Sequence, residues 1–199
     1  MKKGLLLVIS GPSGAGKGTI CKRLLETDEH IKVSVSATTR LPRIGEVEAE
    51  NYFFIDKNKF LEMKDNNEFL EHAKVYDNYY GTPRQFVIDN INRGDDVLLE
   101  IDIDGALQIK DRFEDAVFVF ILPPSLKELK NRIVSRGTES KHDIDKRFSL
   151  AQGEIRQVIK YDYAVLNDDL VKAIDDIKAI ITAEKCKVMR VYEDIKKLI

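Results

Sequence analysis

The sequence predicts an α/β fold in which helices cover both faces of a parallel sheet. Three apolar runs, at residues 5–9, 97–101 and 117–122, are typical of strands that are buried on both sides, and the second is interrupted only by Glu100 near its end. Stretches of helical periodicity lie between and after these runs, as the crossover connections of a parallel sheet require. The length of 199 residues suits one compact domain with small inserted lobes, and 43% apolar residues can form a full core.

The first half of the chain adds shorter elements around the first two runs. A helix is expected at 19–25, and short strands are expected at 33–36 and 52–55. Pro42 and Gly45 punctuate the polar stretch between those two strands. Three elements follow in chain order: a helix at 57–64, a strand at 69–75 that ends at the turn Asp77-Asn78, and a helix at 83–92 that Arg93-Gly94 closes.

The second half continues the alternation of strands and helices. The dipeptide Pro123-Pro124 stops the strand at 117–122, and helices are expected at 126–134 and 144–159. A last short strand is expected at 164–166. From residue 170 onward, apolar residues recur at three-to-seven-residue steps, which predicts one or two long amphipathic helices laid on the sheet. These apolar residues are Ile174, Ile177, Ile181, Val188, Val191 and Ile195.

A glycine-rich loop follows the first apolar run and opens a helix. Residues 11–17 read GPSGAGK and match the phosphate-binding pattern G-x-x-x-x-G-K. Glycines allow positive φ, so that successive amide groups can point at phosphate oxygens, and Lys17 can reach the β- and γ-phosphates. The alternative is an ordinary glycine-rich turn. We expect the following residues to bind ATP: Gly11, Pro12, Ser13, Gly14, Ala15, Gly16, Lys17, Gly18 and Thr19.

The position after Lys17 departs from the general pattern, in which Ser or Thr holds Mg²⁺. Gly18 stands there, and Thr19 follows. The form Gly-Lys-Gly-Thr resembles nucleoside monophosphate kinases such as adenylate kinase, and many bacterial guanylate kinases. We therefore expect Mg²⁺ to be bound mainly through ATP phosphates and water. No dedicated protein metal site is expected, because the histidines are scattered far from one another and from both cysteines.

A second motif is more specific. Residues 36–46 read SATTRLPRIGE, and with the phosphate loop, the run 136–139 and the run 167–169 they resemble guanylate kinases over essentially the whole chain. The resemblance implies an enzyme that transfers the γ-phosphoryl group of ATP to GMP, and to dGMP, giving ADP and GDP. Its place would be purine nucleotide metabolism and GMP recycling. It also implies a P-loop NTPase-type core at 1–36, 92–134 and 150–199, with a GMP-binding insert at 37–91 and a lid at 135–149.

The resemblance also implies which side chains bind GMP. Arg40, Arg43, Tyr52 and Tyr80 would hold its phosphate, which suits the planar fork of arginine and the fixed donor of a phenol. The residues expected on guanine are Ser36, Glu71, Thr82 and Asp102.

Carboxylates would accept from N1–H and N2–H₂ of guanine, and hydroxyls would donate to O6. A solvated basic loop is the alternative for the two arginines, and an ordinary surface acid is the alternative for Glu71. For Asp104, where the family often has Gln, a helix N-terminal acid is favoured over a ligand contact.

The polar stretch at 137–145 is flanked by arginines. The resemblance implies that Arg136 and Arg147 contact ATP phosphates, and that Asn167 contacts adenine. Arg132 has a weaker claim to an ATP contact, and a role on the helix surface suits it equally well. We expect charge to be held during transfer mainly by Lys17, Arg40, Arg136 and Arg147, because phosphoryl transfer depends on positioning and on neutralising charge.

Composition limits the partners. With 32 basic and 34 acidic residues, the chain has no overall field for nucleic acid or for an anionic membrane. The apolar run after Lys3 is too short for a signal peptide or a membrane span, and two distant cysteines suit a reducing compartment. We expect a cytoplasmic protein that is a monomer or weak homo-oligomer. Its partners are expected to be ATP and GMP, with neither nucleic acid nor a membrane among them.

Two other functions are alternatives. The first is a kinase for another nucleotide such as AMP, against which Glu71 and Thr82 argue. The second is a non-catalytic peptide-binding module of the kind found in membrane-associated scaffold proteins. Those modules typically have damaged phosphate loops, whereas 11–17 is intact here.

Overall fold

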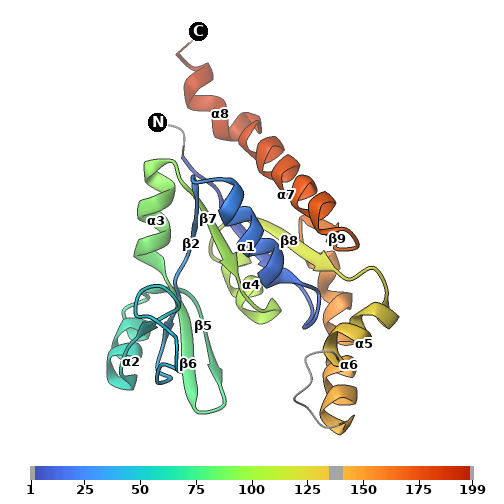
Figure 1. Cartoon of the computed structure of the whole chain (residues 1–199). Helices are drawn as coiled ribbons and strands as arrows, with labels where there is room; N and C mark the ends of the chain where they lie inside the picture. The colour runs from blue at the N-terminus through green and yellow to red at the C-terminus, as the bar shows by residue number, and fades with distance from the viewer. Residues whose placement is uncertain (1–2, 135–140, 198–199) are drawn as a thin grey trace.

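The computed structural model describes residues 3–134 and 141–197. Its centre is a parallel sheet with the strand order β2-β7-β1-β8-β9 (Figure 1). The strands are β2 (Ile31–Val33), β7 (Asp96–Glu100), β1 (Leu6–Ser10), β8 (Val117–Leu122) and β9 (Tyr163–Leu166). The three apolar runs thus form the central strands β7, β1 and β8, as the sequence predicts.

Helices bury both faces of this sheet. Leu5, Leu7 and Ile9 pack with α1 (Lys17–Thr27) and α7 (Leu170–Lys185) in one apolar cluster. Leu6 and Val8 point the other way and pack with α3 (Arg84–Arg93) and α4 (Ile103–Lys110). Because alternate residues of β1 enter opposite clusters, the whole strand must be apolar. The final helix α8 (Val188–Ile195) follows α7, so the predicted C-terminal helical segment is two helices.

The insert between β2 and β7 builds a second sheet. Its strand order is β4-β3-β6-β5, and α2 (Lys57–Asp65) packs against it. The strands are β4 (Phe53–Phe54), β3 (Ala37–Thr38), β6 (Asn78–Pro83) and β5 (Phe69–Val75). The sequence did not predict β6, because Gly81 and Pro83 are both depleted in strands. A tight turn at Tyr76, where φ is 53°, pairs β6 antiparallel with β5.

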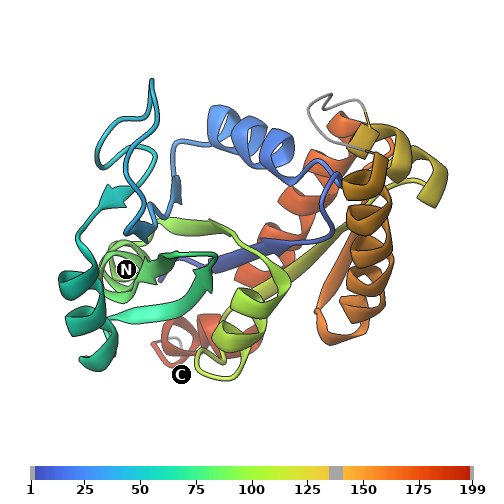
Figure 2. The same cartoon turned by 90° about the horizontal axis from the view of Figure 1, so that it is seen from below.

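Two helices on the other side of the core form the third unit. α5 (Leu126–Val134) packs on α6 (Lys141–Ile155) through Leu129, Ile133 and Ala151, and a short 3₁₀ helix (Arg156–Lys160) follows. The predicted lid at 135–149 is therefore helical from residue 141, and its residues 135–140 lie outside the described part. Figure 2 shows the insert and the α5–α6 pair on opposite sides of the core.

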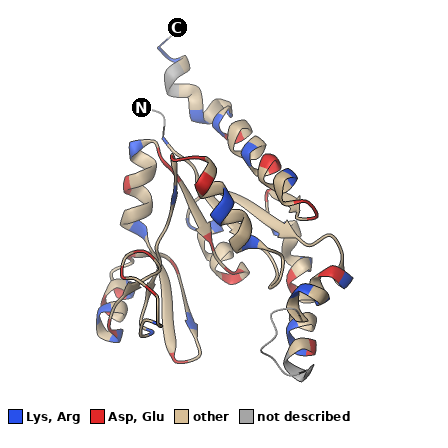
Figure 3. Ribbon diagram, in the orientation of Figure 1, with Lys and Arg blue, Asp and Glu red and all other residues tan. Residues whose placement is uncertain are grey.

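Charged residues and the two cysteines are spread over the fold. Basic and acidic residues are interspersed along α7 and over the α5–α6 pair (Figure 3). Cys21 is buried and Cys186 is exposed, and both are free thiols. Within 3–134 and 141–197, no helix is both long and apolar enough to cross a bilayer.

The small core of the insert gives a stability prediction. Phe60 is 0% exposed and stacks on Phe69 with ring centroids 4.5 Å apart. Phe60→Ala should lower the free energy of unfolding by about 3–5 kcal/mol, because it leaves a cavity that flanking side chains only partly fill. The measurement is urea denaturation followed by circular dichroism. Leu41→Ala is the control, since Leu41 lies in the same insert and is 83% exposed; equal losses in the two variants would contradict the prediction.

Candidate nucleotide-binding site

The loop at 11–17 joins β1 to α1 with a backbone that only glycine tolerates. φ is 147° at Gly11 and 91° at both Gly14 and Gly16. A Cβ atom on Gly11 would lie 2.4 Å from the carbonyl oxygen of Ile121, and one on Gly16 would lie 2.3 Å from Nδ2 of Asn167. The glycines of the motif are therefore needed both for the turn and for close packing against neighbouring elements. Gly16 is the N-cap of α1, so the amide end of that helix faces the loop.

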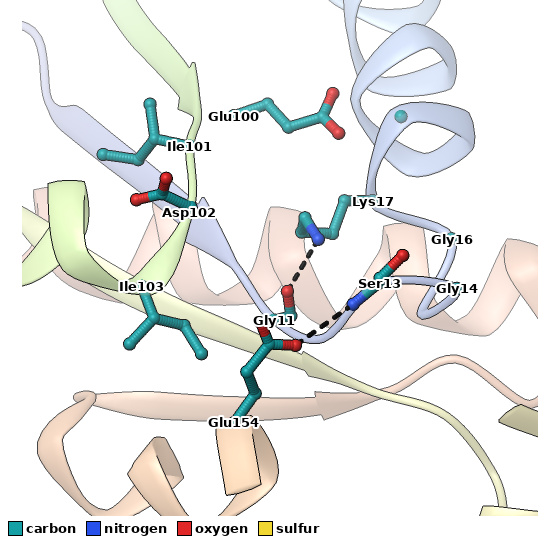
Figure 4. A pocket seen from close by; sticks show the side chains of 11 residues that line it. Gly11, Ser13, Gly14, Gly16, Lys17, Glu100, Ile101, Asp102, Ile103 and Glu154 are labelled. Atoms are coloured by element: carbon teal, nitrogen blue, oxygen red, sulfur yellow. Dashed lines mark hydrogen bonds between the residues drawn. The ribbon is translucent and has the colours of Figure 1, made fainter. Parts of the chain in front are cut away.

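Lys17 folds back over this loop (Figure 4). Its Nζ donates to the carbonyl oxygen of Gly11 at 2.6 Å and to that of Pro12 at 3.2 Å. The loop and Lys17 line a cavity of about 360 Å³, together with Glu100, Asp102 and Glu154. A cavity with an amide-lined floor and an ammonium group at its edge can hold a polyphosphate chain.

Helix α6 contributes two side chains of opposite charge to the same loop. Arg147 Nη2 donates to Ser13 Oγ at 2.6 Å, and the amide of Ser13 donates to Oε2 of Glu154 at 3.4 Å. The two residues are two helical turns apart and share one face of the helix. Sequence reasoning did not single out Glu154, because an acid in the middle of a helix carries no motif. Arg136 lies outside the described residues.

Asn167 also supports the loop. It is buried, its Nδ2 donates to the carbonyl oxygen of Ala15 at 2.8 Å, and its own carbonyl accepts from Arg132 Nη2 at 3.3 Å. Arg132 also bonds to Glu128 on the same helix, at 3.0 Å. Asn167 thus contacts the phosphate loop directly, and Arg132 bonds to Asn167. The adenine contact of Asn167 stays a prediction.

A second cavity of about 370 Å³ opens between the insert and the core. Its lining includes five predicted GMP ligands, Ser36, Tyr52, Glu71, Tyr80 and Asp102. It shares Glu100, Ile101 and Asp102 with the phosphate-loop cavity. Those three residues lie at the carboxyl end of β7, where open α/β sheets bind ligands. The two cavities therefore meet across one short segment of chain.

Arg40 is held in place by a carboxylate that the sequence analysis did not assign. Its Nη1 and Nη2 donate to the two oxygens of Glu46 at 2.9 and 2.8 Å, and the amide of Arg43 donates to Glu46 at 2.7 Å. This pairing raises the pKa of Arg40 and lowers that of Glu46. The guanidinium carbon lies 5.5 Å from the centre of the Tyr52 ring, and Tyr52 meets Tyr80 edge-on at 6.0 Å. Arg40, Tyr52 and Tyr80 thus form one cluster.

Arg43, the remaining residue expected to bind the GMP phosphate, lies at the surface. The side chain of Arg43 is exposed, and only its backbone takes part in the contacts of Glu46. A phosphate role for Arg43 therefore stays a prediction.

The carboxylates expected on guanine are anchored from two directions. Thr82 is fully buried and its hydroxyl donates to Oε1 of Glu71 at 2.6 Å, while Oδ1 of Asp102 accepts from the amide of Gly105 at 2.7 Å. Burial raises the pKa of Glu71; the bond from Thr82 opposes the shift, and the charge of Asp102 adds to it. Thr82 thus faces Glu71 from behind the cavity wall. Asp104 lies exposed in the first turn of α4, as expected of a helix N-terminal acid.

The space beside Gly18 bears on a metal ion. A Cβ atom on Gly18 would lie 3.6 Å from both carboxylate oxygens of Glu100, so this acid stands where a side chain at position 18 would point. Among the residues that the structure describes, no group of three or more His, Cys, Asp or Glu could hold a metal by itself. Any metal here would need ligands from a bound nucleotide or water, with Glu100 as the nearby acid.

Comparison with known proteins identifies the family. The family model described as guanylate kinase matches residues 3–184. The guanylate kinase of Caldanaerobacter subterraneus subsp. tengcongensis is 59% identical over 189 residues, which is 95% of this chain and 92% of that protein. The guanylate kinase of Clostridioides difficile (strain 630) is 57% identical over 195 residues, 98% of this chain and 95% of that protein.

A solved structure agrees with the sequence comparisons. The crystal structure of guanylate kinase from Anaplasma phagocytophilum superposes with a TM-score of 0.75 at 37% identity, covering 95% of this chain and 90% of that one. The match runs through the core, the insert and the α5–α6 pair alike. Since both sequence and fold agree over nearly the full length, the chain belongs to the guanylate kinase family.

Proposed function

We propose that this protein transfers the γ-phosphoryl group of ATP to GMP, giving ADP and GDP, and that it accepts dGMP as well. The observation that carries the proposal is the pair of cavities that meet at residues 100–102. One cavity has a phosphate loop. The other is lined by Glu71 and Asp102 and by Tyr52, beside which Arg40 lies. Two nucleotides bound in these neighbouring cavities would be held in position for transfer between them.

The chemistry needs no covalent intermediate. An oxygen of the GMP phosphate attacks the γ-phosphorus of ATP in line, while the protein holds both groups and spreads positive charge over the transferring oxygens. Lys17 and Arg147 already lie at the phosphate loop, and Arg40 lies in the insert. Arg136 is proposed to join them from the lid. The donor and the acceptor are thus held by separate units of the fold.

Base selection rests on Glu71 and Asp102. Guanine presents two neighbouring donors, N1–H and N2–H₂, and two carboxylates accept from them. Adenine presents an acceptor at N1, so a carboxylate there would face a lone pair. Ser36 lines the same cavity and can donate to O6, and Thr82 fixes the orientation of Glu71 through its hydroxyl. Phosphate binding falls to Arg40, Arg43, Tyr52 and Tyr80.

We further propose that Mg²⁺ takes part, bound mainly by ATP phosphates and water. The ion would neutralise charge on the β- and γ-phosphates. Glu100 fits it, because its carboxylate lines the phosphate-loop cavity beside Gly18 and can hold metal-bound water. The even balance of 32 basic and 34 acidic residues supports a protein without nucleic acid or membrane partners. We propose that it is a cytoplasmic monomer or weak homo-oligomer, and its two distant cysteines suit a reducing compartment.

Lys17→Ala should lower kcat by at least about 10²-fold, as expected for the loss of one strong electrostatic donor to the transition state. Nζ donates to two carbonyls of the loop, outside the apolar clusters of the core, so we expect the variant to fold. The measurement is a coupled assay with ATP and GMP. Lys22→Ala, an exposed position on the same helix, is the control and should keep wild-type kcat. A near-normal kcat in the Lys17 variant would contradict the proposed role of the phosphate loop in phosphoryl transfer.

Arg147→Ala should lower kcat more than it raises the KM for GMP. Its guanidinium lies at Ser13 of the phosphate loop, away from the insert, and its charge is most useful when charge spreads over the transferring group. Steady-state kinetics with varied GMP would show this split. Lys146→Ala, an exposed neighbour on α6, serves as control. A rise in KM for GMP at unchanged kcat would show that α6 acts on the acceptor instead.

Glu71→Gln should cut kcat/KM for GMP by roughly 10²- to 10³-fold, or ~2–4 kcal/mol, while ATP affinity stays nearly unchanged. The amide keeps one acceptor and turns an NH₂ donor toward a donor on the base. The measurement is kinetics with GMP, dGMP, AMP, CMP and UMP, together with calorimetry of ATP binding.

The same panel tests the proposed substrate. Wild-type protein should prefer GMP over AMP, and the Glu71 variant should remain poor with AMP because Ser36 still offers a hydroxyl to the wrong base edge. If the wild-type protein preferred AMP, the proposed specificity for GMP would be wrong and only a general nucleotide kinase function would stand. If the variant kept its GMP turnover, the proposed role of Glu71 in guanine recognition would be wrong.

A further inference from the structure

Both carboxylates proposed to read guanine lie against the same residue, Gly105. A Cβ atom built there would lie 3.1 Å from Oε2 of Glu71 and 3.2 Å from Oδ1 of Asp102. The next nearest atom is Cδ of Glu71, at 3.4 Å. These two acids come from β5 and from the N-cap of α4, so they are far apart in sequence and are brought together at this one position.

The backbone of Gly105 does not explain the glycine. The residue lies in the first turn of α4, in ordinary helical conformation, and its φ is not positive. Alanine would favour such a helix by about 0.5–1 kcal/mol over glycine. Gly105 therefore costs helix stability, and the three nearest atoms that an added methyl group would meet all belong to the two acids.

Glu71 is buried and has little freedom to move away, whereas Asp102 is exposed and is held at the helix end by a backbone amide. Glu71 is 7% exposed, and its Oε1 is fixed from the other side by the hydroxyl of Thr82 at 2.6 Å. Oδ1 of Asp102 is fixed by the amide of Gly105 itself at 2.7 Å. A methyl group at 105 would require the Glu71 or the Asp102 carboxylate to shift by a few tenths of an ångström.

We propose that Gly105 determines base specificity: its missing side chain and its amide together hold the Glu71 and Asp102 carboxylates at the spacing that two neighbouring donors of guanine require. Gly105 is a positioning residue, since it acts through the two acids. The inference rests on the proposed function and adds to it the position that fixes the geometry of the base-reading pair.

The test is Gly105→Ala. We expect kcat/KM for GMP to fall by about 10- to 10²-fold, mainly through KM, because a displacement of well under 1 Å at paired hydrogen bonds is enough for such a loss. ATP affinity by calorimetry and the melting temperature should not fall. Gly153→Ala is the matched control: Gly153 is also helical, with nothing within 4 Å of an added Cβ, and its variant should keep GMP kinetics.

Inosine monophosphate distinguishes a role of Gly105 in positioning the two acids from a general effect of the substitution on the stability of the insert. It keeps N1–H and O6 but lacks the N2 amino group, so it has one donor fewer to place between the two acids. The ratio of kcat/KM for GMP to that for inosine monophosphate should therefore drop in Gly105→Ala. A general weakening of the insert would lower both substrates equally and would overturn the proposal.

A double variant gives the converse readout. Glu71→Asp shortens the acid by one methylene group and should relieve the contact with a methyl at 105, so the double variant should bind GMP better than additivity of the two single variants predicts. Additive losses would overturn the proposal. So would unchanged GMP kinetics in Gly105→Ala, or loss of its ATP affinity or cooperative melting, since α4 itself would then be what needs glycine. Failure of the wild type to phosphorylate GMP would instead overturn the proposed function.

Discussion

The pairing of β1 with β7 fixes the whole site. The two strands are parallel, with Ile9 opposite Glu100, so the phosphate loop leaves the sheet beside the acids at the end of β7. Just beyond this pair, the amide of Ile101 donates to Ile9 at 3.2 Å and the hydroxyl of Ser10 donates to Ile101 at 3.0 Å. A slip of this register would turn side chains to the other face of the sheet and separate the two cavities. The position of the phosphate loop and that of the acids proposed to bind guanine thus both depend on the hydrogen-bonded pairing of β1 with β7.

The sequence predicted the parts of this arrangement that local pattern determines. The buried strands follow from continuous apolar runs, and the phosphate loop follows from its glycines and the helix behind it. The strand β6 and the sheet of the insert were missed, because β6 is stabilised by pairing with β5 and packing on Phe60 rather than by its own composition. Tertiary context overrides weak strand propensity at such a place.

Sequence motifs identified the candidate residues of the site, but they did not identify the hydrogen-bond partners of those residues. Only the folded chain brings together the side chains of Arg40 and Glu46 and those of Thr82 and Glu71, and the carboxylate of Glu154 with the amide of Ser13. The Thr82 contact changes the physical picture most. Its hydroxyl was expected to face guanine directly, and in the structure it donates to a buried carboxylate. A buried acid without such a donor would be costly, so Thr82 makes the buried Glu71 possible.

Acids gather at the end of β7 although both substrates are anions, and glycines make this possible. Gly18 leaves space beside Glu100, and Gly105 leaves space beside Glu71 and Asp102. The mutual repulsion of these groups is visible in Glu71, whose pKa is raised by burial and further by Asp102. Such a cluster repels phosphate groups unless cations lie close by, as Lys17 does in the phosphate-loop cavity and Arg40 does beside Tyr52 of the other cavity. In the proposed function, the acids therefore suit the base of GMP, and the phosphate groups depend on the cations.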